Sequence, residues 1–131
     1  MNAELSFDVP ASPDAVFDHF TNPDLLVRWW PTGSETSPEP GGVYNMWWDG
    51  PGHHLRGRYL KIDRPSRLSS SWRFDHDDTT ERTVDVAISA SESGSRVTIN
   101  HESGSEEESS GYIEGWEHFL GRLIRLFDSE N

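Results

Sequence analysis

The residues with the clearest chemical potential are one arginine and one histidine, each within a strand-like stretch. Arg58 could hold a carboxylate or an enolate through charge-assisted hydrogen bonds, and His101 titrates near neutral pH. If both faced a common interior, they could stabilise an enolate, as a cyclase or an isomerase requires. In the alternative, structural interpretation, Arg58 pairs with an acid such as Glu102, and His101 donates to a backbone carbonyl. A single histidine without a placed partner is weak support for catalysis.

A larger set of residues has the composition of a binding site for a small molecule. Aromatic and aliphatic side chains would supply apolar walls, and an arginine, a serine and a histidine would supply the few polar contacts. Ser70 and Gly57 favour a cavity, because small residues remove volume that a filled core needs. Each aromatic residue taken alone is more often part of a core. The expected site comprises Trp30, Tyr44, Met46, Trp48, Arg58, Ser70, Trp72, His101, Tyr112, Trp116, Phe119 and Leu120.

Two clusters of histidine and acidic residues have the composition of a metal site without its spacing. His53 and His54, with Asp49 nearby, are adjacent in the chain, and adjacent residues of a strand point to opposite faces. Residues 75–78 combine a histidine with three aspartates, but they lack the glycine and the terminal glutamate of a calcium loop. We therefore predict no metal ion and no other cofactor.

The composition limits the partners of the chain. Aspartate and glutamate number 23 against 11 lysines and arginines, for a formal net charge of −12. Such a surface repels phosphate groups, so we expect neither nucleic acid nor a membrane as a partner. There is no cysteine, no apolar run approaches the length of a membrane span, and the first residues lack a signal-peptide pattern. We expect a cytoplasmic protein with one domain over residues 1–131.

Residues 110 to about 127 are predicted to form the helix around which the core is built. At 100° per residue, the apolar side chains share one arc and charged side chains lie opposite. Ser109 or Ser110 is the expected helix cap. Gly115 borders the arc, where a missing side chain would let a strand or a ligand approach. The arc consists of Tyr112, Ile113, Trp116, Phe119, Leu120, Leu123, Ile124 and Phe127.

Alternation of apolar and polar residues predicts strands in most of the remaining chain. Residues 12–30 indicate two short helices, because Ser12 and Asn22 each precede a proline that can begin a helix. Residues 32–42 are expected to be loop. Short connections between consecutive strands predict an antiparallel sheet. The predicted strands are residues 4–9, 43–48, 55–62, 68–74, 83–89 and 96–101.

The same alternation assigns the two faces of the sheet. Arg58, Ser70 and His101 are expected to point toward the helix. The opposite face is mostly polar, and Tyr59 and Trp47 are expected on it. These two aromatic residues are the best candidates to anchor a homodimer, which the sequence leaves open.

Short motifs follow one another in a particular order along almost the whole chain. They are Ser12-Pro13-Asp14-Ala15-Val16-Phe17, the run from Asn22-Pro23-Asp24 to Trp29-Trp30-Pro31, Gly41-Gly42, the run from Asp63-Arg64-Pro65 to Leu68 with Trp72, and Gly115-Trp116. In this order they resemble the SRPBCC superfamily (START-like, Bet v 1-like), and within it the branch of the activator of Hsp90 ATPase homologue 1-like proteins. The resemblance implies an α+β helix-grip fold. In this fold a curved antiparallel six-stranded sheet wraps around a long C-terminal helix, two short helices follow the first strand, and a pocket lies between helix and sheet.

The resemblance does not supply a reaction. The superfamily includes lipid and hormone carriers, polyketide cyclases and aromatases, and chaperone regulators, and this branch has no catalytic signature to carry over. We rank first the binding of a small, largely hydrophobic or aromatic ligand in the cavity. A cyclase-like or aromatase-like enzyme that uses Arg58 and His101 ranks second. A regulator of a chaperone ATPase ranks third, because a single small domain lacks a second domain for that role.

Overall fold

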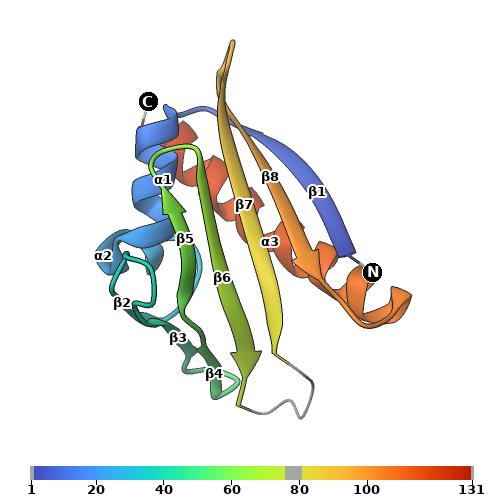
Figure 1. Ribbon diagram of the computed structural model, residues 1–131. Coiled ribbons are helices and arrows are strands. Elements are labelled where there is room, and N and C mark those ends of the chain that lie inside the picture. Colours follow the sequence, from blue (N-terminus) through green and yellow to red (C-terminus); the bar gives the residue numbers. More distant parts are fainter. Residues whose placement is uncertain (1, 76–80, 131) are drawn as a thin grey trace.

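The computed structural model describes residues 2–75 and 81–130 (Figure 1). The chain begins with strand β1 (Asn2–Val9) and continues with two short helices, α1 (Pro13–Thr21) and α2 (Pro23–Leu26). Helix α2 is shorter than the sequence predicts. Trp29 and Trp30 therefore reach the core from the turn after α2, where they are 0% and 4% exposed.

Both short helices begin where the sequence predicts. The Ser12 hydroxyl accepts a hydrogen bond from the Ala15 N–H at 3.2 Å, and Asn22 Oδ1 accepts one from the Asp24 N–H at 2.9 Å. A proline at the first helical position follows each cap. These caps fix where the chain turns away from β1 and back toward the sheet.

The chain between α2 and the last helix, together with β1, forms an antiparallel sheet. Within the described residues the sheet has eight strands rather than the six predicted. Their order is β1-β8-β7-β6-β4-β3-β2, and β5 also pairs with β6. The strands after α2 are β2 (Gly33–Thr36), β3 (Tyr44–Trp48), β4 (His53–Arg56), β5 (Tyr59–Asp63), β6 (Arg67–Phe74), β7 (Arg82–Ser91) and β8 (Gly94–Glu102).

One additional strand lies within the predicted loop. Strand β2 pairs with β3, with Gly33 opposite Trp47 and Thr36 opposite Tyr44. A Cβ atom at Gly33 would lie 2.2 Å from the Trp47 ring, so the glycine makes room for that ring against the strand. The proline and glycine content of residues 32–42 suggested loop, but the pairing partner determines the structure here.

The other additional strand arises because the predicted strand over residues 55–62 is broken at Gly57. A Cβ atom at Gly57 would lie only 2.0 Å from the Ser71 carbonyl oxygen, so β6 approaches the backbone too closely for any other residue. The Arg58 N–H donates to the Ser71 hydroxyl at 2.9 Å, and the chain resumes as β5. The glycine therefore permits close contact between strands and does not open the cavity that the sequence analysis expected from it.

The break reverses the predicted faces of the residues that follow it. Tyr59 is fully buried at 0% exposure, Leu60 is 54% exposed, and Arg58 lies on the exposed face. A register shift between Tyr59 and Lys61 then restores the alternation. The predicted homodimer surface loses one of its two anchors, because Tyr59 belongs to the core.

The long helix α3 (Glu106–Glu130) packs against the sheet, as the sequence predicts, and lies behind the strands in Figure 1. It begins four residues before the predicted start at 110. Its cap is Ser105, whose hydroxyl accepts a hydrogen bond from the Glu108 N–H at 3.1 Å, rather than Ser109 or Ser110. Three glutamates occupy the first turn, where the helix dipole favours negative charge.

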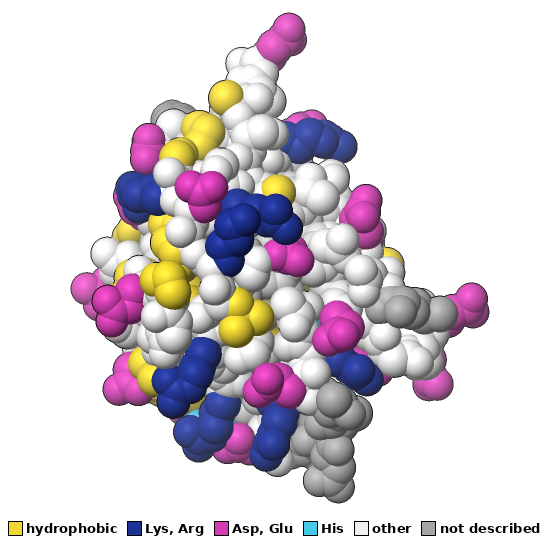
Figure 2. Space-filling view, viewed as in Figure 1, with side chains coloured by type: hydrophobic (Ala, Val, Ile, Leu, Met, Phe, Trp, Pro, Cys, Tyr) yellow, Lys and Arg dark blue, Asp and Glu magenta, His cyan; other side chains and the backbone are white. Residues whose placement is uncertain are grey.

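The buried side of α3 covers the inner face of the sheet. The buried apolar arc contains Trp116, Leu120, Leu123 and Phe127. The opposite face of the sheet mixes acidic, basic and scattered hydrophobic side chains (Figure 2). None of the helices in the described residues has the length and the apolar character needed to cross a membrane.

Candidate functional site: an aromatic pocket

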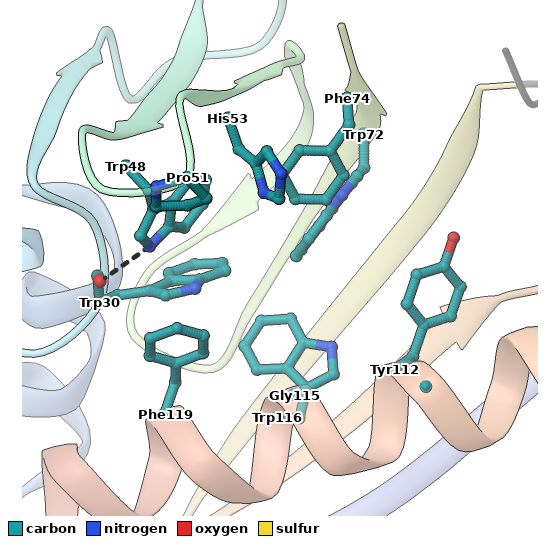
Figure 3. A pocket seen from close by; sticks show the side chains of 11 residues that line it. Trp30, Trp48, Pro51, His53, Trp72, Phe74, Tyr112, Gly115, Trp116 and Phe119 are labelled. Carbon is teal, nitrogen blue, oxygen red and sulfur yellow. Dashed lines mark hydrogen bonds between the residues drawn. The ribbon is translucent and has the colours of Figure 1, made fainter. Parts of the chain in front are cut away.

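A pocket lies between the first part of α3 and the hairpin formed by β3 and β4 (Figure 3). Its volume is about 280 Å³. Among the described residues, no lysine, arginine, aspartate or glutamate lines it. The lining consists of Trp30, Trp48, Pro51, His53, Trp72, Phe74, Gly111, Tyr112, Gly115, Trp116 and Phe119.

Trp30 is the centre of the aromatic part of this lining. Its ring centroid lies 4.9 Å from that of Trp116, 5.6 Å from that of Trp72 and 6.2 Å from that of Trp48. The interplanar angles lie between 45° and 63°, within the tilted and edge-on arrangements that aromatic pairs prefer. The Trp48 indole N–H also donates to the Trp30 carbonyl oxygen at 3.1 Å. These contacts hold the indole rings against one another and give the pocket a fixed shape.

His101 lies behind the pocket wall and orients two of the residues that form it. Its Nδ1 accepts a hydrogen bond from the Trp116 indole N–H at 3.1 Å. Its ring stacks on that of Tyr112, with centroids 3.6 Å apart and an interplanar angle of 9°. Burial lowers the pKa of His101 to about 3, so the imidazole stays neutral near pH 7 and keeps a nitrogen that can accept from Trp116.

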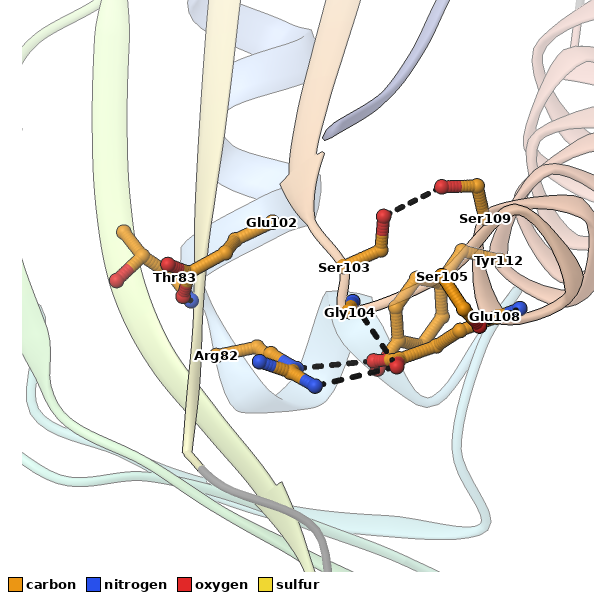
Figure 4. Close-up of polar contacts among 9 residues, drawn as sticks. All are labelled: Arg82, Thr83, Glu102, Ser103, Gly104, Ser105, Glu108, Ser109 and Tyr112. Carbon is orange, nitrogen blue, oxygen red and sulfur yellow. Dashed lines mark hydrogen bonds and ion pairs between the residues drawn. The ribbon is translucent and has the colours of Figure 1, made fainter. Parts of the chain in front are cut away.

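The hydroxyl end of Tyr112 is fixed by an ion pair at the start of α3 (Figure 4). Tyr112 donates to Glu108 Oε1 at 2.7 Å, and the Arg82 guanidinium donates to both carboxylate oxygens at 2.9 and 3.1 Å. The Gly104 N–H adds a further hydrogen bond to Glu108 Oε2 at 3.0 Å. This carboxylate therefore ties a wall of the pocket on α3 to strand β7.

The same contacts set the protonation of the network. Burial alone would raise the pKa of Glu108, but the hydrogen bonds from Arg82 and Tyr112 outweigh it and hold this pKa below its usual value. Burial, followed by the hydrogen bond to Glu108, raises the pKa of Tyr112. Near neutral pH, Glu108 is charged and Tyr112 is a neutral donor, which is the combination that the observed hydrogen bond requires.

Apart from Arg58 and His101, the predicted site residues fall into two groups. The first group lines the pocket and consists of Trp30, Trp48, Trp72, Tyr112, Trp116 and Phe119. The second group is at most 2% exposed, is not part of the lining and belongs to the filled core: Tyr44, Met46, Ser70 and Leu120. Ser70, offered as a residue that leaves space, lies in this filled part.

The predicted acid–base pair is not assembled. Arg58 is exposed on the outer face of the sheet, where its Nη1 donates to the Gly41 carbonyl oxygen at 3.0 Å. His101 is buried on the inner side. The structural alternative also differs in detail, because Glu102 accepts from the Thr83 N–H at 3.1 Å and His101 bonds to an indole rather than to a carbonyl.

Sequence reasoning missed several lining residues, of which Pro51 and His53 come from the hairpin between β3 and β4. The sequence prediction starts the second hairpin strand at Leu55, which leaves His53 in a turn. In the structure His53 pairs directly with Trp48, so the two side chains share a face. Extending the second strand back to the predicted turn at Gly50-Pro51-Gly52 would have revealed this. Phe74 and Gly111 also line the pocket and were not proposed.

The histidine pair of β4 does not converge on one point. His53 lines the pocket, whereas the His54 ring stacks on that of Trp47 with centroids 6.4 Å apart. The two therefore point to opposite faces, as adjacent strand residues do. Of the second cluster of histidine and acidic residues, residues 76–78 lie outside the described residues. Among the residues that are described, no three His, Asp or Glu side chains are grouped to hold a metal ion.

The fold has many structural relatives. A protein from Mesorhizobium loti superposes with a TM-score of 0.89 at 19% identity, covering 100% of this chain and 99% of that one. The AHSA1 protein from Silicibacter pomeroyi gives a TM-score of 0.78 at 23% identity, covering 100% of both chains. DynU16, from the dynemicin biosynthetic locus, gives 0.87 at 20% identity, covering 99% of this chain and 48% of that one. These similarities show a shared fold.

The sequence also matches a protein family. The family described as Activator of Hsp90 ATPase homolog 1-like protein matches residues 10–128, which is nearly the whole chain. Among curated proteins, none matches this sequence. The chain belongs to the Activator of Hsp90 ATPase homolog 1-like family, in agreement with the SRPBCC resemblance of its motifs.

Proposed function

We propose that this member of the Activator of Hsp90 ATPase homolog 1-like family binds a small, uncharged, largely planar aromatic molecule in the pocket between α3 and the sheet. The lining of the pocket is the observation that carries the proposal, because it combines seven Trp, Tyr and Phe rings with no Lys, Arg, Asp or Glu among the described residues. A charged ligand would lose its hydration there without gaining a counter-charge. An aromatic ligand would gain apolar burial and further tilted ring contacts.

Binding is favoured over catalysis by the placement of the polar groups. A cyclase or an aromatase needs acid and base groups that face the substrate. Arg58 and His101 are the pair expected to do this. Arg58 lies on the outer face of the sheet, whereas His101 is buried behind the pocket wall. The Tyr112 hydroxyl in the lining already donates to Glu108. A chaperone-regulating role rests on the family name, and no contact in the described residues favours it.

The structural relative DynU16 is consistent with this proposal. It shares the fold and comes from the dynemicin biosynthetic locus. The low identity transfers only the fold, so the ligand of the present chain is proposed from its own pocket.

The test combines identification of a bound species with direct titration. Native mass spectrometry of freshly purified protein, followed by extraction, would detect a resident ligand. Titration then compares neutral N-phenyl-naphthylamine, its charged relative anilinonaphthalene sulfonate, and decanoate as an aliphatic anion. We expect the neutral aromatic probe to bind most tightly. A folded protein that binds none of them and carries no resident molecule contradicts the proposal.

Two neighbouring tryptophans provide a matched pair of variants. Trp48 lines the pocket, and Trp47 lies on the opposite face of the same strand. Trp48→Ala should weaken binding of N-phenyl-naphthylamine by about tenfold or more, because it removes a large apolar contact. Trp47→Ala should leave the affinity nearly unchanged. Equal effects of the two substitutions would place the probe outside this pocket.

A further inference from the structure

Two glycines, one helical turn apart, form part of the pocket wall. Gly111 and Gly115 both line the pocket, and their spacing of four residues places them on one face of α3. Figure 3 shows Gly115 beside Trp116, on the side of the helix that borders the pocket. Both positions are in the helix interior, where glycine is the least favourable residue after proline.

Nothing in the described structure requires glycine at these two positions. Neither residue has a positive φ. A Cβ atom built at Gly111 or at Gly115 would meet no described atom within 4 Å. Gly57 shows the contrast, because a Cβ atom there would lie 2.0 Å from a backbone oxygen. Alanine would therefore fit at both helical positions and would make the free protein more stable.

What the glycines provide is a strip of bare helix backbone, flanked by Tyr112 and Trp116. We propose that this strip, called here the glycine ledge (Gly111 and Gly115), is the surface against which part of the ligand lies. The aromatic rings around Trp30 would hold one ring of the ligand, and the ledge would accept the ring fused to it. Methyl groups at the two positions would occupy the space that this second ring needs.

This inference rests on the proposed function and narrows its ligand class. It predicts that the natural ligand is a fused-ring aromatic rather than a single ring, because the ledge contributes to binding only if a second ring lies against it. It also gives a physical reason for tolerating two helix-weakening residues in one element.

Gly121 is the matched control on the same helix. A Cβ atom there would meet only Arg125 Nη1, at an ordinary contact distance of 3.5 Å, and Gly121 does not line the pocket. Gly111→Ala, Gly115→Ala and Gly121→Ala should each raise the melting temperature by about 4 °C. This common gain shows that the three variants are folded and comparable.

The decisive measurement is binding of two neutral probes by calorimetry. N-phenyl-naphthylamine contains fused rings, and toluene contains a single ring. Gly111→Ala and Gly115→Ala should weaken binding of the fused-ring probe about tenfold and leave toluene binding within about twofold of wild type. Gly121→Ala should bind both probes as wild type does.

Two further outcomes separate this inference from the proposed function. If wild type binds the fused-ring probe and both ledge variants bind it equally well, the ledge inference is wrong and the proposed function stands. If wild type binds neither probe, the proposed function fails and the ledge inference fails with it.

Discussion

Two hollows lie on opposite faces of the same sheet, and their linings are opposite in character. The inner pocket, of about 280 Å³, is lined by aromatic rings and two glycines. The outer hollow, of about 510 Å³, is lined mainly by polar and charged residues, among them Arg56, Arg58 and Arg73. Figure 2 shows that side of the molecule, where basic and acidic side chains are intermixed.

The two hollows differ in whether their lining groups have other partners when no ligand is bound. In the outer hollow, Arg56 pairs with Asp75 at 2.9 Å while the two side chains remain 61% and 43% exposed, so water and a neighbouring acid already satisfy it. Aromatic rings around an open space have no comparable substitute, because an empty volume offers no atoms for dispersion contacts. An open apolar pocket is therefore the stronger indication of a ligand, although the polar hollow is larger.

The largest expected effect tests whether the inner cage, formed by the rings of Trp30, Trp48, Trp72 and Trp116, supports the fold. Trp30→Ala should lower the free energy of unfolding by about 3–5 kcal/mol, because Trp30 is buried and contacts most of the cage. Trp47→Ala, on the outer face, should cost only about 1 kcal/mol. Chemical denaturation of both variants measures the difference. Similar losses of unfolding free energy in the two variants would mean that the two faces of the sheet contribute equally to stability, against the contrast drawn above.

A second effect concerns the buried histidine behind the cage. The folded pKa of His101 is depressed to about 3, so its contribution to stability is complete above the unfolded value near 6.5 and is lost as pH falls toward 3. The expected slope from this group is up to about 1.4 kcal/mol per pH unit. His101→Gln should flatten the profile of unfolding free energy between pH 6.5 and 4.

The control for this pH experiment is a histidine on the solvent side of α3. His118 is exposed on α3, so His118→Gln makes the same substitution without disturbing the buried core. If His101→Gln and wild type lose stability in parallel on acidification, His101 is not the buried neutral group that the geometry indicates.

A third and smaller effect concerns the link between the pocket wall and β7. Tyr112→Phe should lower the unfolding free energy by about 1–2 kcal/mol, because it removes a hydrogen bond to the charged Glu108. The raised pKa of Tyr112 also means that its stabilisation is complete below pH 10 and is lost as pH rises further. The variant should show less of this alkaline loss. A variant as stable as wild type at pH 7 would show that the link contributes nothing.

The smallest expected effect belongs to the outer hollow. Arg58→Ala removes an exposed side chain that donates a hydrogen bond to a backbone carbonyl, so the melting temperature should change by less than about 2 °C. Affinity for N-phenyl-naphthylamine should stay at the wild-type value. A large loss of ligand binding in this variant would move the functional site to the outer face.

The sequence predicted those parts of the fold in which local pattern and tertiary structure agree. The apolar arc of α3 and the alternation in β6, β7 and β8 set the helix and the inner face correctly. The family resemblance added the helix-grip arrangement. The start of α3 was misplaced because its acidic first turn looked too polar to pack, although helix capping and the dipole favour such residues there.

The errors in the site have a common physical origin. Alternation extended through Gly57 places Arg58 inside, but the close approach of β6 interrupts the strand at that glycine. The prediction misses His53 because β4 begins two residues earlier than the predicted strand. Both errors depend on how neighbouring strands pair and approach one another. The alternation of residues within one strand contains no information on that pairing. Most aromatic residues of the pocket are easier to identify, since all but Trp30 lie on a regular strand or on α3.

The four indole rings of the cage should make the pocket visible by near-ultraviolet circular dichroism. Four of the six tryptophans, Trp30, Trp48, Trp72 and Trp116, line the pocket, and their rings are fixed at unequal angles to one another. Near-ultraviolet circular dichroism depends on such fixed aromatic packing, whereas the far-ultraviolet signal depends on the backbone. The near-ultraviolet spectrum of this protein should therefore report mainly on the order of the pocket, and loosening of the cage would be visible before any helix or strand is lost.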